Sequence, residues 1–158
     1  MSSNILIVYY SRSANTQKLA KLIQQKTGGT FCEIQPEKAY PASYNAVVEQ
    51  AKKEIQAGFR PALKTTVENL ETYDTVFIGS PNWCSTIAPP IATFLDNYDL
   101  SGKTVVPFCT HGGGGFESIE RDIKKLCPGS IVLSGLAVYG GGNAESQVSA
   151  WLKKLGIS

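Results

Sequence analysis

Residues that bind metals are scarce in this sequence. There is one histidine, His111, and the four cysteines Cys32, Cys84, Cys109 and Cys127 form no Cys-x-x-Cys pair. A structural zinc site needs about four nitrogen or sulfur ligands at close spacing. The sequence therefore argues against a zinc site, and the cysteines are interpreted as buried or idle thiols of a reducing compartment.

Long apolar runs and a strong net charge are also missing. No stretch approaches the ~18 consecutive apolar residues of a membrane span, so no membrane partner is expected. The beginning, MSSNILIVYY, lacks the cationic start of a signal peptide, which predicts a cytoplasmic protein. The formal charge of +2 is small and evenly spread, so nucleic acid is not expected as a partner either.

Short apolar runs, rich in valine and isoleucine, recur along the chain. They cover residues 5–10, 30–34, 75–79, 104–109 and 131–139. Most are nearly continuous, as is typical of strands covered on both faces, and segments with helical spacing separate them. This alternation predicts an α/β fold, a parallel sheet with helices on both faces, formed by a single domain over residues 1–158.

Three loops of unusual composition follow the first, third and fourth apolar runs. Their sequences are SRSANTQ, SPNWCSTIAPP and THGGGGFES. The carboxyl ends of parallel strands meet at one edge of a sheet, and ligands bind there near the point where strand order reverses. We therefore expect these three loops to form one site.

The first loop has the composition of an anion site. Ser11, Ser13 and Thr16 offer hydroxyl donors, and the backbone N–H groups of residues 12–16 lie where a helix is expected to begin. The alternative is that Ser13 or Asn15 only caps the helix. Neither the P-loop pattern nor the dinucleotide pattern Gly-x-Gly-x-x-Gly follows the first run, so a phosphate bound without a metal is the favoured interpretation.

The other two loops are suited to a flat polar ring. Trp83 follows a buried strand, where an aromatic side chain makes a platform for a heterocycle, although a lone tryptophan is often a core or rim residue. The four glycines at 112–115 let the backbone approach a ligand closely, the alternative being a flexible turn.

These loops resemble those of the flavodoxins. SRSANT is similar to the T/S-x-T/S-G-x-T phosphate loop of that family, with Ala14 where glycine is common, and TYDTVFIGSPNW resembles the strand and loop whose tryptophan stacks on the flavin. The resemblance covers nearly the whole chain and includes the closing VYGGG. It implies a flavodoxin-like three-layer sandwich of the short-chain type, with a five-stranded sheet in the order 2-1-3-4-5.

The resemblance also implies flavin mononucleotide (FMN) as the cofactor. It places the FMN ligands in the three loops, at Ser11, Arg12, Ser13, Ala14, Asn15, Thr16, Pro81, Asn82, Trp83, Cys84, Ser85, Thr110, His111, Gly112, Gly113, Gly114, Gly115 and Phe116.

Three features depart from a typical flavodoxin. The chain is slightly basic, whereas such carriers are strongly acidic and are steered to basic partners. The outer face of the flavin is either open or covered by Phe116, Tyr40 or Tyr44. After the tryptophan stand Cys84 and Ser85, where a glycine would ease a rearrangement of the backbone.

The primary functional prediction is an FMN-binding electron-transfer protein whose redox partner the sequence does not name. The alternative is an FMN-dependent NAD(P)H oxidoreductase that passes electrons to a quinone or another small acceptor. A binding module without FMN is a third hypothesis. The flavin would supply the redox chemistry in both active cases, so no residue is predicted to be catalytic, and His111 is the one side chain whose usual pKa suits proton transfer.

Overall fold

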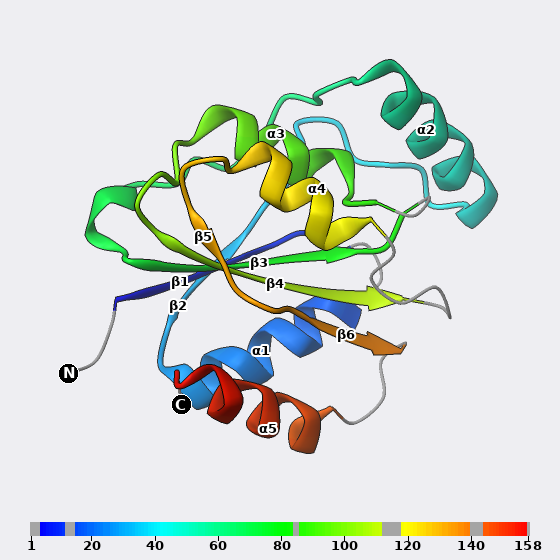
Figure 1. Cartoon of the computed structure of the whole chain (residues 1–158). Coiled ribbons are helices and arrows are strands. Elements are labelled where there is room, and N and C mark those ends of the chain that lie inside the picture. Colours follow the sequence, from blue (N-terminus) through cyan, green and yellow to red (C-terminus); the bar gives the residue numbers. More distant parts are fainter. Residues whose placement is uncertain (1–3, 12–14, 84–85, 112–117, 140–143, 158) are drawn as a thin grey trace.

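Figure 1 shows the computed structural model, a twisted parallel sheet between two layers of helices. The structure describes residues 4–11, 15–83, 86–111, 118–139 and 144–157. Its sheet has six strands in the order β2-β1-β3-β4-β5, and β6 pairs with β4. The strands are β1 (Ile5–Tyr9), β2 (Thr30–Glu33), β3 (Thr75–Pro81), β4 (Thr104–His111), β5 (Ile131–Val132) and β6 (Leu136–Tyr139). The predicted fold and strand order are confirmed.

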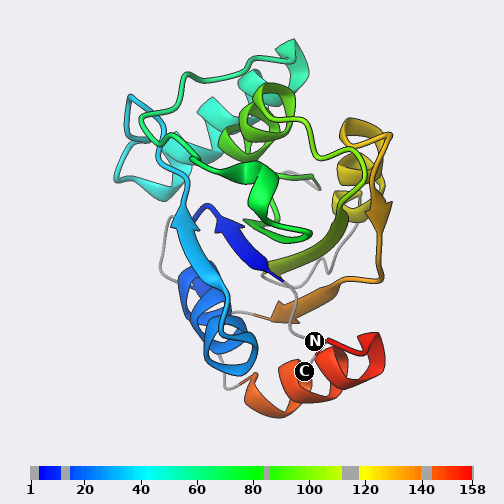
Figure 2. The same cartoon turned by 90° about the vertical axis from the view of Figure 1, so that its left-hand side faces the viewer.

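Helices cover both faces of the sheet, as Figure 2 shows from the side. The helices are α1 (Asn15–Thr27), α2 (Tyr44–Ala57), α3 (Pro89–Asn97), α4 (Ile119–Leu126) and α5 (Glu145–Leu155), with a 3-10 turn η1 (Leu70–Thr72). Helices α1 and α5 pack on one face, and α3 and α4 pack on the other with α2 beside α3. No described helix is both long enough and apolar enough to pass through a membrane.

The central strands are buried on both sides, which explains their continuous apolar sequences. In β1, Leu6 and Val8 belong to the core under α3 and α4, whereas Ile5, Ile7 and Tyr9 belong to the core under α1 and α5. Since successive side chains of a strand point to opposite faces, both faces need apolar residues here. The sheet is therefore shared by two cores.

The fifth apolar run differs from the single strand that was expected over residues 131–139. Val105 of β4 pairs with Val132, and Phe108 pairs with Leu136. Two residues lie between Val105 and Phe108 in β4. Three residues lie between Val132 and Leu136, so the fifth run contains one extra residue. Such an insertion is a bulge, and it divides the run into β5 and β6.

Side chains from two helices bind the backbone of this bulge. The N–H of Gly135 donates to Oε2 of Glu120 in α4 at 3.1 Å. The carbonyl of Ser134 accepts a hydrogen bond from Nε1 of Trp151 in α5 at 3.0 Å. Backbone groups that the bulge withdraws from the sheet ladder are thus paired, as partly buried polar groups require.

Candidate functional site

The carboxyl ends of β1, β3 and β4, after which the three loops begin, lie side by side at one edge of the sheet, because these strands are adjacent and parallel (Figure 1). Two hydrogen bonds join them. The N–H of Asn82 donates to the carbonyl of Thr110 at 2.9 Å, and the hydroxyls of Thr16 and Thr110 are 2.8 Å apart. Thr110 therefore connects the start of α1 with the end of β3, so the described ends of the loops meet at this edge.

Hydroxyl groups and a helix start meet in the first loop. Asn15 is the first residue of α1, and Oγ of Ser11 accepts the N–H of Gln17 at 3.3 Å, so Ser11 takes part in capping this helix. A hydroxyl that accepts one hydrogen bond still has its own proton to donate to a ligand. Arg12, Ser13 and Ala14 lie outside the described residues.

The electrostatics of this helix start favour an anion. The first turn of α1 contains no acidic residue, so no carboxylate offsets the partial positive charge of its N-terminus. Thr16 is only 1% exposed, and its hydroxyl shares one proton with that of Thr110. One O–H of this buried pair therefore remains as a donor for a ligand oxygen.

Hydrogen bonds fix the described residues on both sides of the second loop. Trp83 and Thr86 exchange two backbone hydrogen bonds of 3.0 Å each. Before these two residues, Oγ of the fully buried Ser80 donates to the carbonyl of Pro81 at 2.7 Å and accepts the N–H of Ala88 at 2.9 Å. Sequence analysis missed Ser80, because nothing in its spacing distinguishes it from an ordinary strand residue.

Cys84 and Ser85, which follow Trp83 in the sequence, lie outside the described residues. Pro81 is the last residue of β3, so the predicted ligands Pro81, Asn82 and Trp83 all lie at the carboxyl edge of the sheet.

Trp83 is half-buried in a cluster of three aromatic rings. Its ring centroid lies 5.4 Å from that of Tyr10 and 5.1 Å from that of Tyr40, and both contacts are nearly perpendicular. The hydroxyl of Tyr40 donates to Oε1 of Glu54 in α2 at 2.6 Å. Burial first, and then this carboxylate, raise the pKa of Tyr40. A protonated Tyr40 held by α2 thus fixes the orientation of Trp83.

This cluster bears on the expected cover of the flavin. Tyr40 packs against Trp83, so its ring belongs to the support of the tryptophan. The side chain of Tyr44 and the whole of Phe116, the other two candidates for the outer face, lie outside the described part of the chain. The sequence pattern does not reveal the cluster, because its members come from three distant segments.

The third loop begins beside an exposed aromatic side chain. His111 ends β4, and its ring centroid lies 5.7 Å from that of Tyr139 at the end of β6. Tyr139 is 69% exposed. Sequence analysis missed Tyr139, although an aromatic residue at the carboxyl end of a strand was a usable signal. The glycines at 112–115 lie outside the described residues.

Two buried thiols belong to the core under α3 and α4. Cys109 is fully buried in β4, and burial raises its pKa to about 12. Burial likewise raises the pKa of Cys127 to about 11. Both therefore remain neutral thiols at ordinary pH, as the idle interpretation predicts. Within the described ranges, no three histidine, cysteine, aspartate or glutamate side chains come close enough to hold a metal ion.

Comparisons with known proteins agree with this architecture. A family model for flavodoxin matches residues 4–155. A Bacteroides eggerthii protein assigned to the flavoproteins is 32% identical, with a TM-score of 0.88 over 99% of this chain and 100% of that one. A Lactobacillus acidophilus flavoprotein in complex with FMN is 26% identical, with a TM-score of 0.78 over 95% of this chain and 99% of that one.

A relative with a named enzyme activity is also similar. The NAD(P)H dehydrogenase (quinone) of Cupriavidus metallidurans is 27% identical over 144 residues, which are 85% of this chain and 71% of that protein. The family model spans nearly the whole sequence, and the sheet order agrees with it. The chain therefore belongs to the flavodoxin family.

Proposed function

We propose that this protein binds FMN at the carboxyl edge of the sheet and transfers electrons through it. The observation that carries the proposal is the junction at Thr110, which holds the hydroxyl-rich start of α1 and the Trp83 loop at one edge. A bound flavin supplies the redox chemistry, and the protein supplies binding and orientation. The FMN complex of the Lactobacillus acidophilus flavoprotein supports this choice of cofactor.

In this proposal the first loop holds the phosphate. Ser11 and the O–H that remains in the Thr16–Thr110 pair donate to phosphate oxygens, with the backbone N–H groups at the start of α1. Trp83 contacts the flat ring, and the loop after His111 lends backbone groups to the polar end of that ring. The other loop residues named from the sequence remain proposed ligands.

The phosphate assignment is tested by comparing FMN with riboflavin, which lacks the phosphate. Calorimetry on the apoprotein should show much weaker binding of riboflavin, because each lost charged hydrogen bond costs about 1.5–3 kcal/mol. Thr16→Val should weaken FMN but not riboflavin. Thr27→Val is the matched control, since Thr27 lies in the same helix and its hydroxyl donates to the carbonyl of Ile23. Equal affinities for FMN and riboflavin would contradict the assignment.

A second candidate function is an NAD(P)H-dependent oxidoreductase with a small acceptor such as a quinone. The relative from Cupriavidus metallidurans supports it, as does the exposed ring of Tyr139 beside His111, which offers an aromatic surface at the edge of the site. Anaerobic mixing of the FMN-loaded protein with NADH or NADPH distinguishes the two. Rapid bleaching of the flavin absorbance favours the oxidoreductase, whereas an unreactive flavin that dithionite reduces favours the carrier.

A further inference from the structure

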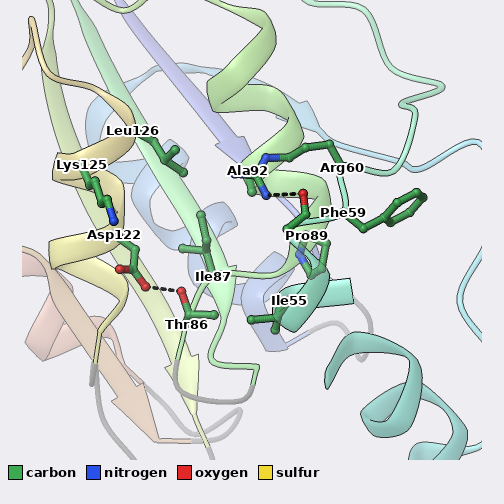
Figure 3. Close-up of a pocket in the computed structure, with 11 residues that line it drawn as sticks. Ile55, Phe59, Arg60, Thr86, Ile87, Pro89, Ala92, Asp122, Lys125 and Leu126 are labelled. Carbon is green, nitrogen blue, oxygen red and sulfur yellow. Dashed lines mark hydrogen bonds between the residues drawn. The ribbon is translucent and has the colours of Figure 1, made fainter. Parts of the chain in front are cut away.

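A cavity lies behind the Trp83 loop, on the face of the sheet that α2, α3 and α4 cover (Figure 3). Its volume is about 320 Å³, at the small end of the range for ligand sites. Most of its surface is apolar. The apolar side chains come from the end of α2 and the segment after it, from the start of α3 and the segment before it, and from the end of α4. They are Ile55, Phe59, Ile87, Pro89, Ala92 and Leu126.

Charged side chains at the mouth of this cavity are paired, with one exception. Nε of Arg60 lies 2.5 Å from Oδ2 of Asp96. Asp122 accepts a hydrogen bond from the hydroxyl of Thr86 and lies 3.6 Å from Nε of Arg121. Lys125 forms neither an ion pair nor a hydrogen bond with any other side chain that the structure describes. The cavity thus combines an apolar interior with one available cation.

We propose that this cavity is a second small-molecule site, which binds an amphipathic monoanion such as an aromatic carboxylate. The apolar body of the ligand fills the space between Ile55, Ile87 and Leu126, where it loses contact with water. Its carboxylate pairs with the ammonium of Lys125, the one rim cation that has no acid of its own. A dianion would leave one charge without a partner, since Arg60 is held by Asp96.

The cavity also communicates with the candidate flavin site. Thr86 lines the cavity, donates its hydroxyl to Asp122, and exchanges two backbone hydrogen bonds with Trp83. A ligand in the cavity contacts Thr86 directly and therefore changes the environment of Trp83. Trp151, the other tryptophan, packs in the opposite core and donates its indole N–H to Ser134. The two indole N–H signals thus separate a local response from a general one.

The test is a nuclear magnetic resonance titration of the whole chain with 2-naphthoate, with saturating FMN and again without FMN. The methyl signals of Ile55, Ile87 and Leu126 and the indole signal of Trp83 should shift, while that of Trp151 should not. Lys125→Gln should weaken the binding of 2-naphthoate about tenfold, because one charged hydrogen bond is lost. The affinity for the neutral 2-naphthol should not change. Lys153→Gln, on exposed α5, is the matched control for the charge change.

Three outcomes would overturn the proposal. The first is an absence of methyl shifts in the cavity, and the second is a set of shifts around Trp83 and Tyr10 that disappears with FMN and spares Ile55. The third is an equal loss of affinity in Lys125→Gln and Lys153→Gln, which would indicate general charge attraction. The test of this site does not depend on FMN binding, because the methyl signals of the cavity report directly on binding of 2-naphthoate. A failure of FMN binding would therefore be seen separately from a failure of this site.

Discussion

At the scale of single residues, Gly79 of β3 lies directly against the ring of Phe108 of β4. The two residues are register partners, and Phe108 is fully buried. A Cβ atom built on Gly79 would lie 2.2 Å from the ring of Phe108, far inside van der Waals contact. Glycine is therefore needed at position 79 for space, so that the ring can lie across the neighbouring strand.

Gly79→Ala should lower the free energy of unfolding by about 1–3 kcal/mol, because overpacking displaces the ring of Phe108. Urea denaturation followed by circular dichroism measures this loss. The double variant Gly79→Ala/Phe108→Leu should lose less than the sum of the two single variants, since the smaller side chain relieves the clash. If the losses in the two single variants added up to the loss in the double variant, the side chain at position 108 would not be the source of the clash.

Cys109 should make the stability of the protein depend on pH in the alkaline range. Its thiol has a pKa of about 12 in the folded chain, against an ordinary value of 9.0. Below pH 9 both states keep the proton. Above pH 9 the unfolded chain releases it and the folded chain does not, so stability falls as the pH rises towards the folded pKa.

Between pH 8 and pH 11 the native protein should lose about 2.5 kcal/mol more than Cys109→Ala. Cys109→Ala also loses stability because its side chain is smaller, but this loss is the same at every pH. Comparing how stability changes with pH in the two proteins therefore removes it. Cys127→Ala should change the slope in the same direction but less, because the pKa of Cys127 is raised only to about 11. Urea midpoints at several pH values give the slopes, and parallel profiles for all three proteins would contradict the prediction.

At the scale of elements, the bulge between β5 and β6 depends on α4 and α5. Glu120→Ala removes the acceptor of the Gly135 N–H and should cost about 1 kcal/mol of stability. Glu120→Gln should cost less, because its amide oxygen still accepts this hydrogen bond. Lys124→Gln is the control for the Glu120–Lys124 ion pair, which is 3.7 Å long. Equal losses in Glu120→Ala and Lys124→Gln would place the effect in the ion pair instead.

The same elements show what a sequence can and cannot predict. The strands of the two-sided core were predictable, because burial on both faces demands continuous apolar runs. The bulge was not, since it depends on acceptors and donors that Glu120 and Trp151 bring from distant helices. The positions of the three loops at one edge could be inferred from the ends of the strands. The packing of Tyr10 and Tyr40 on Trp83 could not be inferred, because these residues come from distant segments.

At the scale of the whole molecule, one sheet serves two cores, and each core contains one tryptophan. Trp83 packs against the core under α3 and α4, and Trp151 belongs to the core under α1 and α5. A single cooperative domain over the chain, which was predicted from the sequence, would lose both cores together.

Single-tryptophan variants test this cooperativity. In Trp83→Phe, the remaining Trp151 reports on the core under α1 and α5. In Trp151→Phe, the remaining Trp83 reports on the core under α3 and α4. Within each variant, the urea transition seen by tryptophan emission should coincide with that seen by far-ultraviolet circular dichroism. Emission that changes before the dichroism in either variant would show that one layer opens independently of the other.

The direction of the strands also determines how far from the candidate site a module fused to either end of the chain would lie. β1 begins, and α5 ends, at the edge of the sheet opposite the candidate site (Figure 1). A module joined before Ile5 or after Leu155 would therefore start on the far side of the sheet from Trp83. The 8 residues of β4 span about 26 Å at ~3.3 Å per residue. A linker to such a module would have to cover at least this distance along the outside of the helices, so tethering by a short peptide would hold the module away from the candidate site.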